Sequence, residues 1–348
     1  MTENGQLPRT PYMDYLRVIA SFAVIIIHTV SFTWYTPILQ DFGWKTYCTA
    51  GCLSRWGVPI FVMISGALFL NREIPLKKLY CKYILRLVSA YLIWSAIFSF
   101  TGQGTFTSRV YDFLDGPFHM WFVPMLIGLY ICTPLIKKII TDDKSIIYFL
   151  ILSFIFASLI PTVSLLIKDF SGGIINRLSA AIASCLDKLK IHMVLGYSGY
   201  YILGYYLNKT NLREKVQNII YILGIFGFGL TIILTFAVSR KANRLVENYF
   251  DYLTLNVLFS SAAVFVWFKT RKYSSSKINA LMAKLSKYSF GAYIIHMFVL
   301  HTLKRNQFPE LFSNPILRIY CTGITVYLIA TGISAILNHI PGINKYVV

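Results

Sequence analysis

One apolar stretch near the start of the chain carries three ionisable side chains. The segment YMDYLRVIASFAVIIIHTVSFTW, residues 12 to 34, contains Asp14, Arg17 and His28. Ionisable groups at such depth in an apolar helix are costly and mark functional sites. With about 100° between successive residues, these three and Ser21 fall within roughly 60° of one another. The spacing therefore predicts a polar stripe on one helix face, directed into the interior of a bundle.

The guanidinium and the imidazole of this stripe suit different tasks. A guanidinium pairs with phosphate oxygens at two points, whereas an imidazole gains and loses a proton near neutral pH and can act as a general base on a hydroxyl. Arg17 and His28 are about three helical turns, or roughly 16 Å, apart, which a long anionic donor can span. Two alternatives stay open: Asp14 and Arg17 form an ordinary ion pair at a helix end, and His28 is a hydrogen-bonded buried imidazole.

Other polar residues occur within or beside later apolar stretches. His296 shares a helical face with Tyr293, and His119 precedes an apolar stretch beside an acidic loop. We expect His296, Tyr293 and His119 to contact the substrate, although an interhelical hydrogen bond also explains His296. Arg86 lies at the end of a span, where it would either make a second phosphate contact or extend to the interface.

The elements that position these residues must be membrane helices. Of the residues, 56% are hydrophobic and only 14% charged, with a mean hydropathy of +0.60, against about 25% charged in a typical soluble domain. Only helices and closed barrels satisfy their backbone groups in lipid, and apolar windows near 20 residues indicate helices. The sequence predicts an all-α bundle of about ten spans. The expected spans are residues 12–34, 53–70, 83–101, 120–136, 145–167, 191–208, 216–238, 251–268, 288–303 and 315–338.

The basic residues of the connecting segments predict the orientation. Segments 71–82, 137–144, 209–215 and 269–287 together hold sixteen Lys and Arg, against about eleven in the alternate loops. Because cytoplasmic loops are enriched in Lys and Arg, these four segments and both termini are predicted to be cytoplasmic. We therefore expect a multi-pass protein of the cell membrane.

Composition disfavours several other classes of protein. The net charge of +19 resides mostly in short loops, so it indicates topology rather than nucleic-acid binding. The six cysteines are scattered, and they predict neither a disulfide framework nor a metal site. The first apolar run lacks a small-residue cleavage site, so we expect no removed signal peptide.

Four motifs resemble one known family. An Asp, an Arg three residues later and a His eleven residues after that, on the first helix, look like the signature of the acyltransferase family 3 membrane proteins. VPIFVMISGALFL at 58–70, HMWFVPMLIGLYICTPLI at 119–136 and YSFGAYIIHMFVL at 288–300 are similar to further stretches of that family. The resemblance covers nearly the whole chain, which we expect to form one domain, residues 1–348.

The resemblance implies an activity. Such proteins pass an acyl group from cytoplasmic acyl-coenzyme A to a hydroxyl, often of a sugar or envelope polymer. Arg17, assisted by Arg86, would bind the phosphates of the donor, which we expect to be acetyl-CoA or another acyl-CoA. His28 would be the catalytic residue, and Asp14 would orient and neutralise Arg17. No metal is expected, and the partners would be the donor, a hydroxyl-bearing small molecule or glycan, and the bilayer.

A second function fits the same motif. The membrane half of vancomycin-resistance serine racemases is similar to this family, so a serine-transporting or serine-binding domain is the alternative to an O-acyltransferase. A soluble domain, fused or separate, can follow the C-terminus under that alternative. A purely structural or receptor role ranks last, because it leaves the polar stripe without a purpose.

Overall fold

The chain folds into helices throughout the residues whose structure is defined. The computed structural model describes residues 10–31, 41–101, 105–188 and 192–347, and every regular element in them is helical, as predicted. The elements are α1 (Pro11–Ser31), α2 (Phe42–Ser54), α3 (Gly57–Phe69), α4 (Leu76–Lys78), η1 (Leu79–Ile84), α5 (Leu85–Thr101), α6 (Phe106–Asp115), η2 (Phe118–Trp121), α7 (Phe122–Ile139), α8 (Asp143–Ser153), η3 (Phe154–Leu159), α9 (Ile160–Phe170), α10 (Gly173–Asp187), α11 (His192–Lys209), α12 (Glu214–Ala242), η4 (Asn248–Phe250), α13 (Leu255–Thr270), α14 (Ser276–Arg305), η5 (Pro309–Leu311), α15 (Pro315–His339) and α16 (Ile343–Tyr346).

Many of these elements join into helical stretches that are long and apolar enough to cross a membrane. Eight helical stretches of the described residues meet both conditions: Pro11–Ser31, Phe42–Phe69, Leu76–Thr101, Phe106–Ile139, Asp143–Phe170, Glu214–Ala242, Asn248–Thr270 and Pro315–His339. Each of the eight overlaps a predicted span. The remaining predicted spans, 191–208 and 288–303, coincide with α11, which packs against α3, and α14, which packs against α1 and α15. Residues 32–34 and 191 of the predicted spans lie outside the described residues.

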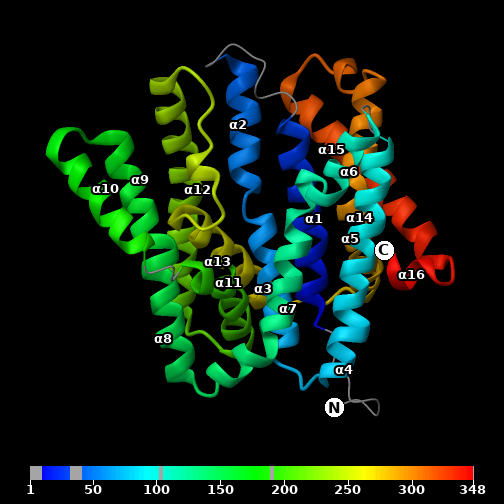
Figure 1. Cartoon of the computed structure of the whole chain (residues 1–348), viewed down its shortest axis with the longest axis horizontal. Coiled ribbons are helices and arrows are strands. Elements are labelled where there is room, and N and C mark those ends of the chain that lie inside the picture. Colours follow the sequence, from blue (N-terminus) through cyan, green and yellow to red (C-terminus); the bar gives the residue numbers. More distant parts are fainter. Residues whose placement is uncertain (1–9, 32–40, 102–104, 189–191, 348) are drawn as a thin grey trace.

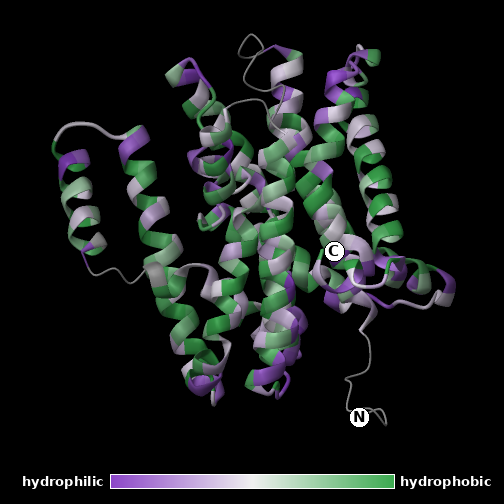
Figure 2. Ribbon diagram, turned by 45° about the vertical axis from the view of Figure 1, so that its right-hand side comes forward, coloured by the Kyte–Doolittle hydropathy of each residue, from purple (hydrophilic) through white to green (hydrophobic). Residues whose placement is uncertain are grey.

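Apolar side chains cover the outside of the bundle. Figure 2 shows hydrophobic residues along the helices and hydrophilic residues gathered toward their ends. Large aliphatic side chains such as Ile222, Ile225 and Leu328 are more than half exposed. Lipid is the solvent that accepts such a surface, and the helix is the structure that satisfies the backbone within it. The protein is therefore a multi-pass membrane protein.

Helix α1 occupies the centre of the bundle. It packs against α2, α3, α13, α14 and α15 (Figure 1). Residues around its whole circumference, including Leu16, Val18 and Val24, are buried. A helix that is buried on every side occupies an interior position. The polar stripe of α1 is consequently held between neighbouring helices.

The second span begins earlier than predicted. The sequence indicated residues 53–70, but the helix starts at Phe42 and continues through α2 and α3 with a break at Arg55 and Trp56. Two glycines and two threonines between positions 43 and 51 lower the hydropathy of the first half, so the prediction of its boundary was wrong. The break places Arg55 within the length of the span, whereas the predicted boundary at residue 53 put it close to the end.

Helices α3 and α11 approach each other closely through glycine. A Cβ atom built on Gly66 would lie 1.7 Å from the carbonyl oxygen of Tyr201, and one on Gly204 would lie 2.0 Å from that of Met63. Only glycine permits such backbone contact, which is a common way for membrane helices to associate. The contact fixes α3 firmly beside α11.

The four basic segments lie at one end of the bundle. Contacts join them: Lys137 Nζ lies 3.6 Å from Glu73 Oε1, Lys209 Nζ lies 3.0 Å from Asp143 Oδ1, Lys269 Nζ donates to Thr210 O at 2.7 Å, and Tyr15 Oη donates to Asn279 Oδ1 at 3.1 Å. The last of these contacts shows that the first turn of α1 lies at the same end of the bundle. Arg17 is therefore near the basic end of the bundle, and His28 is toward the opposite end.

Candidate functional site

Three histidines from distant parts of the chain meet inside the bundle. The ring centroid of His28 on α1 lies 5.0 Å from that of His296 on α14 and 6.3 Å from that of His119 in η2. The rings of His119 and His296 are 5.5 Å apart. His119 and His296 are buried, and His28 is partly exposed. We call these three residues the histidine cluster.

The packing of α1 on α14 creates the cluster. The two helices run in the same direction, since Arg17 Nη1 donates to Ser286 Oγ at 3.4 Å and His28 lies against His296 about three turns further on. Arg17 and His28 thus share the face of α1 that meets α14, as their spacing predicts. Polar side chains of that face are placed between helices and away from lipid.

Helix α14 also holds the third histidine. The Tyr293 hydroxyl donates to the backbone carbonyl of His119 at 2.5 Å, and His119 Nε2 lies 3.4 Å from the carbonyl oxygen of Ile294. Because a carbonyl only accepts, the Nε2 atom of His119 carries the hydrogen in this contact. Two contacts to one helix turn fix both the backbone and the ring of His119 beside His296.

The tautomer of His296 leaves one ring nitrogen as an acceptor. Its Nδ1 atom contacts the carbonyl oxygen of Tyr293 one turn earlier, so Nδ1 carries the hydrogen and Nε2 carries the lone pair. Among the described residues, this buried Nε2 has no hydrogen-bond partner. Buried polar atoms are nearly always paired, so the cluster contains an acceptor position suited to a ligand hydroxyl or N–H.

A cationic cavity lies at the Arg17 side of the histidine cluster. Its volume is about 270 Å³, and side chains of α1, α3, η1, α5, α7 and α14 line it. Three of these side chains are basic: Arg17, Arg86 and Lys287. Arg17 Nη1 also lies 3.7 Å from Asp14 Oδ1, and the Arg86 guanidinium lies 5.7 Å from the centroid of the Phe290 ring. The cavity suits an anion of moderate size, because it concentrates positive charge within an apolar wall.

Two aromatic rings separate this cationic cavity from the histidines. Tyr293 and Phe122 line the cavity, and their ring centroids are 5.8 Å apart. The ring of Tyr293 also lies 5.9 Å from that of His296. Tyr293 therefore borders both the cavity and the histidine cluster.

A second polar groove lies on the other side of the cluster. It has a volume of about 540 Å³, and Arg55, Glu247, Asp251 and Tyr252 are among its lining residues. The Arg55 guanidinium is 4.3 Å from the centroid of the Phe250 ring. Most of the lining comes from the segment 247–254. Asn256 Nδ2 donates to the Tyr249 carbonyl oxygen of this segment at 2.9 Å and to Thr231 Oγ1 of α12 at 2.8 Å, which ties the segment to that helix. We call this the acidic-aromatic groove.

An aromatic stack connects this groove with the histidine cluster. The ring of Trp121, two residues after His119, stacks on Tyr252 with centroids 5.6 Å apart and lies 5.7 Å from Tyr197. The cationic cavity and the acidic-aromatic groove thus approach the histidine cluster from different sides.

The structure separates the predicted site residues into two groups. Arg17, Arg86 and Tyr293 line the cationic cavity, whereas His28, His119 and His296 form the histidine cluster. Asp14 is buried beside Arg17, about 21 Å along α1 from His28 by helix rise. It is therefore placed to act on the guanidinium and not on the imidazole.

Sequence reasoning missed two contributors to these spaces. Lys287 was included only in the count of basic residues of segment 269–287, and Arg55 lay close to the end of the predicted span 53–70. Their positions depend on the packing of α14 on α1 and on the break between α2 and α3. No local pattern signals either one. Within the described part of the chain, no group of three or more His, Cys, Asp or Glu side chains is arranged to hold a metal ion.

The chain is thus a membrane-embedded helix bundle in which a histidine cluster lies near two polar spaces. The family model of the acyltransferase domain, acyltransferase 3, matches residues 10–335. The chain therefore belongs to the acyltransferase 3 family, as the motifs indicated. No curated protein and no solved structure matches the chain.

Proposed function

We propose that the protein is a membrane O-acyltransferase that moves an acyl group, expected to be acetyl, from acyl-coenzyme A to a hydroxyl of a cell-envelope sugar or related acceptor. Family membership supports transfer of an acyl group. The observation that carries the finer proposal is the cationic cavity beside three histidines, because it pairs an anion-binding space with groups that transfer protons.

The donor would enter from the basic end of the bundle. Coenzyme A carries several phosphates, and Arg17, Arg86 and Lys287 supply three cations within one cavity. The same end holds the segments with the most Lys and Arg, which supports a cytoplasmic position for it. Cytoplasmic acyl-CoA would then reach Arg17 directly, and Asp14 would keep the guanidinium oriented.

The histidine cluster would carry out the transfer. His28 takes the proton of the acceptor hydroxyl while the oxygen attacks the thioester carbonyl. The resulting tetrahedral intermediate collapses, so that the carbon–sulfur bond breaks and the ester bond remains. The proton then passes from the His28 imidazolium to the thiolate, which leaves as free coenzyme A.

The other two histidines would assist His28. The lone pair on His296 Nε2 can accept a hydrogen bond from the hydroxyl or from the His28 ring, which holds either in place. His119 is tied to α14 by two contacts and would limit the space beside His28. Tyr293 would lie along the path of the thioester, because it borders both the cavity and the cluster.

The acceptor would occupy the acidic-aromatic groove. Carboxylates of Glu247 and Asp251 accept hydrogen bonds from hydroxyl groups, and the partly exposed ring of Tyr252 suits contact with a sugar ring. The stack of Trp121 on Tyr252 continues this surface toward His119. These features favour a polyol or glycan acceptor.

The test is transfer from radiolabelled acetyl-CoA in membranes that contain the protein. Loss of a general base lowers rates by roughly 10²- to 10⁴-fold, so His28→Ala should abolish measurable transfer while coenzyme A binding is retained. His339→Ala is the matched control, because His339 is exposed and lies on the last turn of α15. Wild-type turnover by His28→Ala, or saturable serine uptake without a donor requirement, would contradict the proposal.

A further inference from the structure

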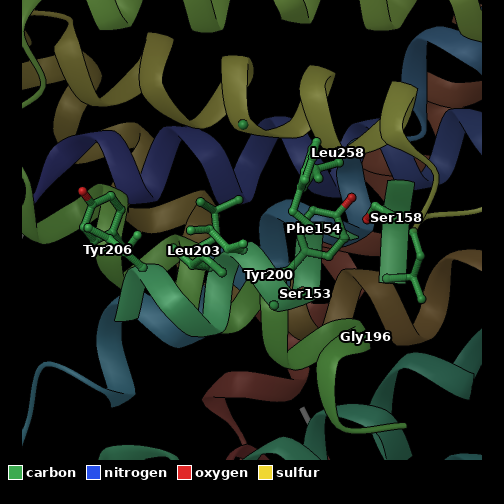
Figure 3. A pocket seen from close by; sticks show the side chains of 14 residues that line it. Ser153, Phe154, Ser158, Gly196, Tyr200, Leu203, Tyr206 and Leu258 are labelled. Carbon is green, nitrogen blue, oxygen red and sulfur yellow. The ribbon is translucent and has the colours of Figure 1, made fainter. Parts of the chain in front are cut away.

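A lateral apolar groove lies beside the proposed acceptor site. Its volume is about 450 Å³, and α8, η3, α11 and α13 line it with mostly aliphatic and aromatic side chains (Figure 3). On its open side, Ile147, Ile151 and Phe154 are exposed. These residues belong to the spanning stretch Asp143–Phe170, so the groove opens toward the hydrocarbon of the bilayer.

Two deep polar side chains of this apolar groove are bonded to the protein itself. Ser153 Oγ donates to the carbonyl oxygen of Leu195 at 2.6 Å, and the Tyr200 hydroxyl donates to that of Tyr252 at 2.6 Å. Both side chains are buried. With these hydroxyls satisfied, the surface offered to a ligand is apolar, which suits a hydrocarbon chain and not a sugar.

The apolar groove adjoins the acidic-aromatic groove. Leu253 lines both spaces, and η3 contributes Ala157 to the polar one and Ser158 to the apolar one. The bond from Tyr200 to the backbone of Tyr252 ties the walls of the two spaces together. One amphiphilic molecule can therefore place a chain in the first space and a polar head in the second.

We propose that the acceptor is a hydroxylated membrane lipid whose hydrocarbon chain lies in the apolar groove and whose sugar or polyol head lies in the acidic-aromatic groove. This inference rests on the proposed acyl transfer and adds the physical form of its acceptor. A water-soluble acceptor needs only the polar groove, whereas a lipid uses both adjoining spaces. Entry from the bilayer also delivers the acceptor hydroxyl to a buried cluster without a wide aqueous opening.

The first experiment measures lipid binding independently of catalysis. The protein is reconstituted in phosphatidylglycerol vesicles that contain a glucosyl diacylglycerol with a diazirine in one acyl chain. After illumination, we expect labelled peptides from α8–η3, α11 and α13. Leu203→Trp fills the groove and should reduce this labelling at least fivefold, as should Ile151→Trp at the open side, where a larger ring is accommodated.

Leu328→Trp is the matched control for bulk on a lipid-facing surface, because Leu328 is exposed on α15. Equal labelling around the whole bundle, unchanged by both groove variants, would overturn the lipid site. Two substitutions at different depths keep the test valid if one of them prevents folding.

The second experiment separates this inference from the proposed function. Membranes receive radiolabelled acetyl-CoA, and the products are partitioned between organic solvent and water. We expect the label in the organic phase, and at least a tenfold loss for Leu203→Trp with coenzyme A binding unchanged. Label confined to a water-soluble glycan would refute the lipid acceptor and leave acyl transfer intact. Absence of any transfer would refute the proposed function, and the photolabelling result would then decide the lipid site alone.

Discussion

The charge on Arg17 provides a direct test of the donor site. Removing the guanidinium should weaken coenzyme A binding, since a hydrogen bond to a charged group contributes about 1.5–3 kcal/mol. That range corresponds to a rise in Kd of roughly 10- to 100-fold. The choice of substitution matters, because Arg17 pairs with a buried carboxylate: the Asp14 side chain is only 5% exposed, and the Arg17 side chain is 30% exposed. Arg17→Gln alone would leave a buried carboxylate next to a neutral group.

The paired substitution Asp14→Asn with Arg17→Gln avoids this problem. Both groups become neutral while their shapes stay similar, so the loss of donor affinity can be read without a large loss of stability. The assay is titration calorimetry of coenzyme A with purified protein at two salt concentrations. Salt should weaken binding to the wild type more than to the variant, because screening acts on the charges that the variant lacks.

Arg240→Gln is the control for loss of a guanidinium elsewhere on the protein. Arg240 is exposed in the last turn of α12, at the end of the bundle opposite to the cationic cavity. The Kd of the Arg240→Gln variant for coenzyme A should equal that of the wild type. If the paired variant binds coenzyme A as tightly as the wild type does, or if Arg240→Gln weakens binding equally, the assignment of the donor phosphates to Arg17 is wrong.

Three further predictions concern other helices of the bundle. Arg86→Gln and Lys287→Gln should each raise the KM for acetyl-CoA by roughly tenfold with little change in kcat, because both side chains line the cationic cavity. A fall in kcat with an unchanged KM would contradict this prediction. Tyr293→Phe removes the bond to the His119 carbonyl and should lower kcat about fivefold, as a bond of about 1 kcal/mol implies; unchanged steady-state kinetics would refute it. Gly66→Ala should lower the free energy of unfolding in detergent by about 1–3 kcal/mol through overpacking against Tyr201. Gly229→Ala is the control and should not destabilise the protein, because the space around Gly229 is open. Equal melting temperatures of the two variants would argue against the close contact.

The sequence predicted best what helix geometry alone determines. The eleven-residue interval between Arg17 and His28 fixes a shared face, and both side chains meet α14 in the structure. Hydropathy likewise located the spans that lipid surrounds. The boundary of α2 was missed because its small polar residues are covered by other helices, as where Cys52 Sγ contacts the Thr231 carbonyl at 3.7 Å.

Features that depend on packing between distant segments could not be predicted. The meeting of His28, His119 and His296 requires the placement of η2 against α14, and no interval in the sequence encodes it. The helix α10 was missed for another reason: it has only 15 residues and stands apart from the bundle with α9 (Figure 1), so neither length nor burial marks it.

The cluster joins the first helix of the chain to one of the last, and this has a consequence for biosynthesis. Because α14 is translated long after α1, the face of α1 that meets α14 enters the bilayer without that partner helix. The carboxylate of Asp14 and the guanidinium of Arg17 lie 3.7 Å apart on successive turns of α1, so they neutralise each other before any partner helix arrives. The internal ion pair thus lowers the cost of placing these two charges in the membrane, and a chain that ended before α14 would lack the histidine cluster.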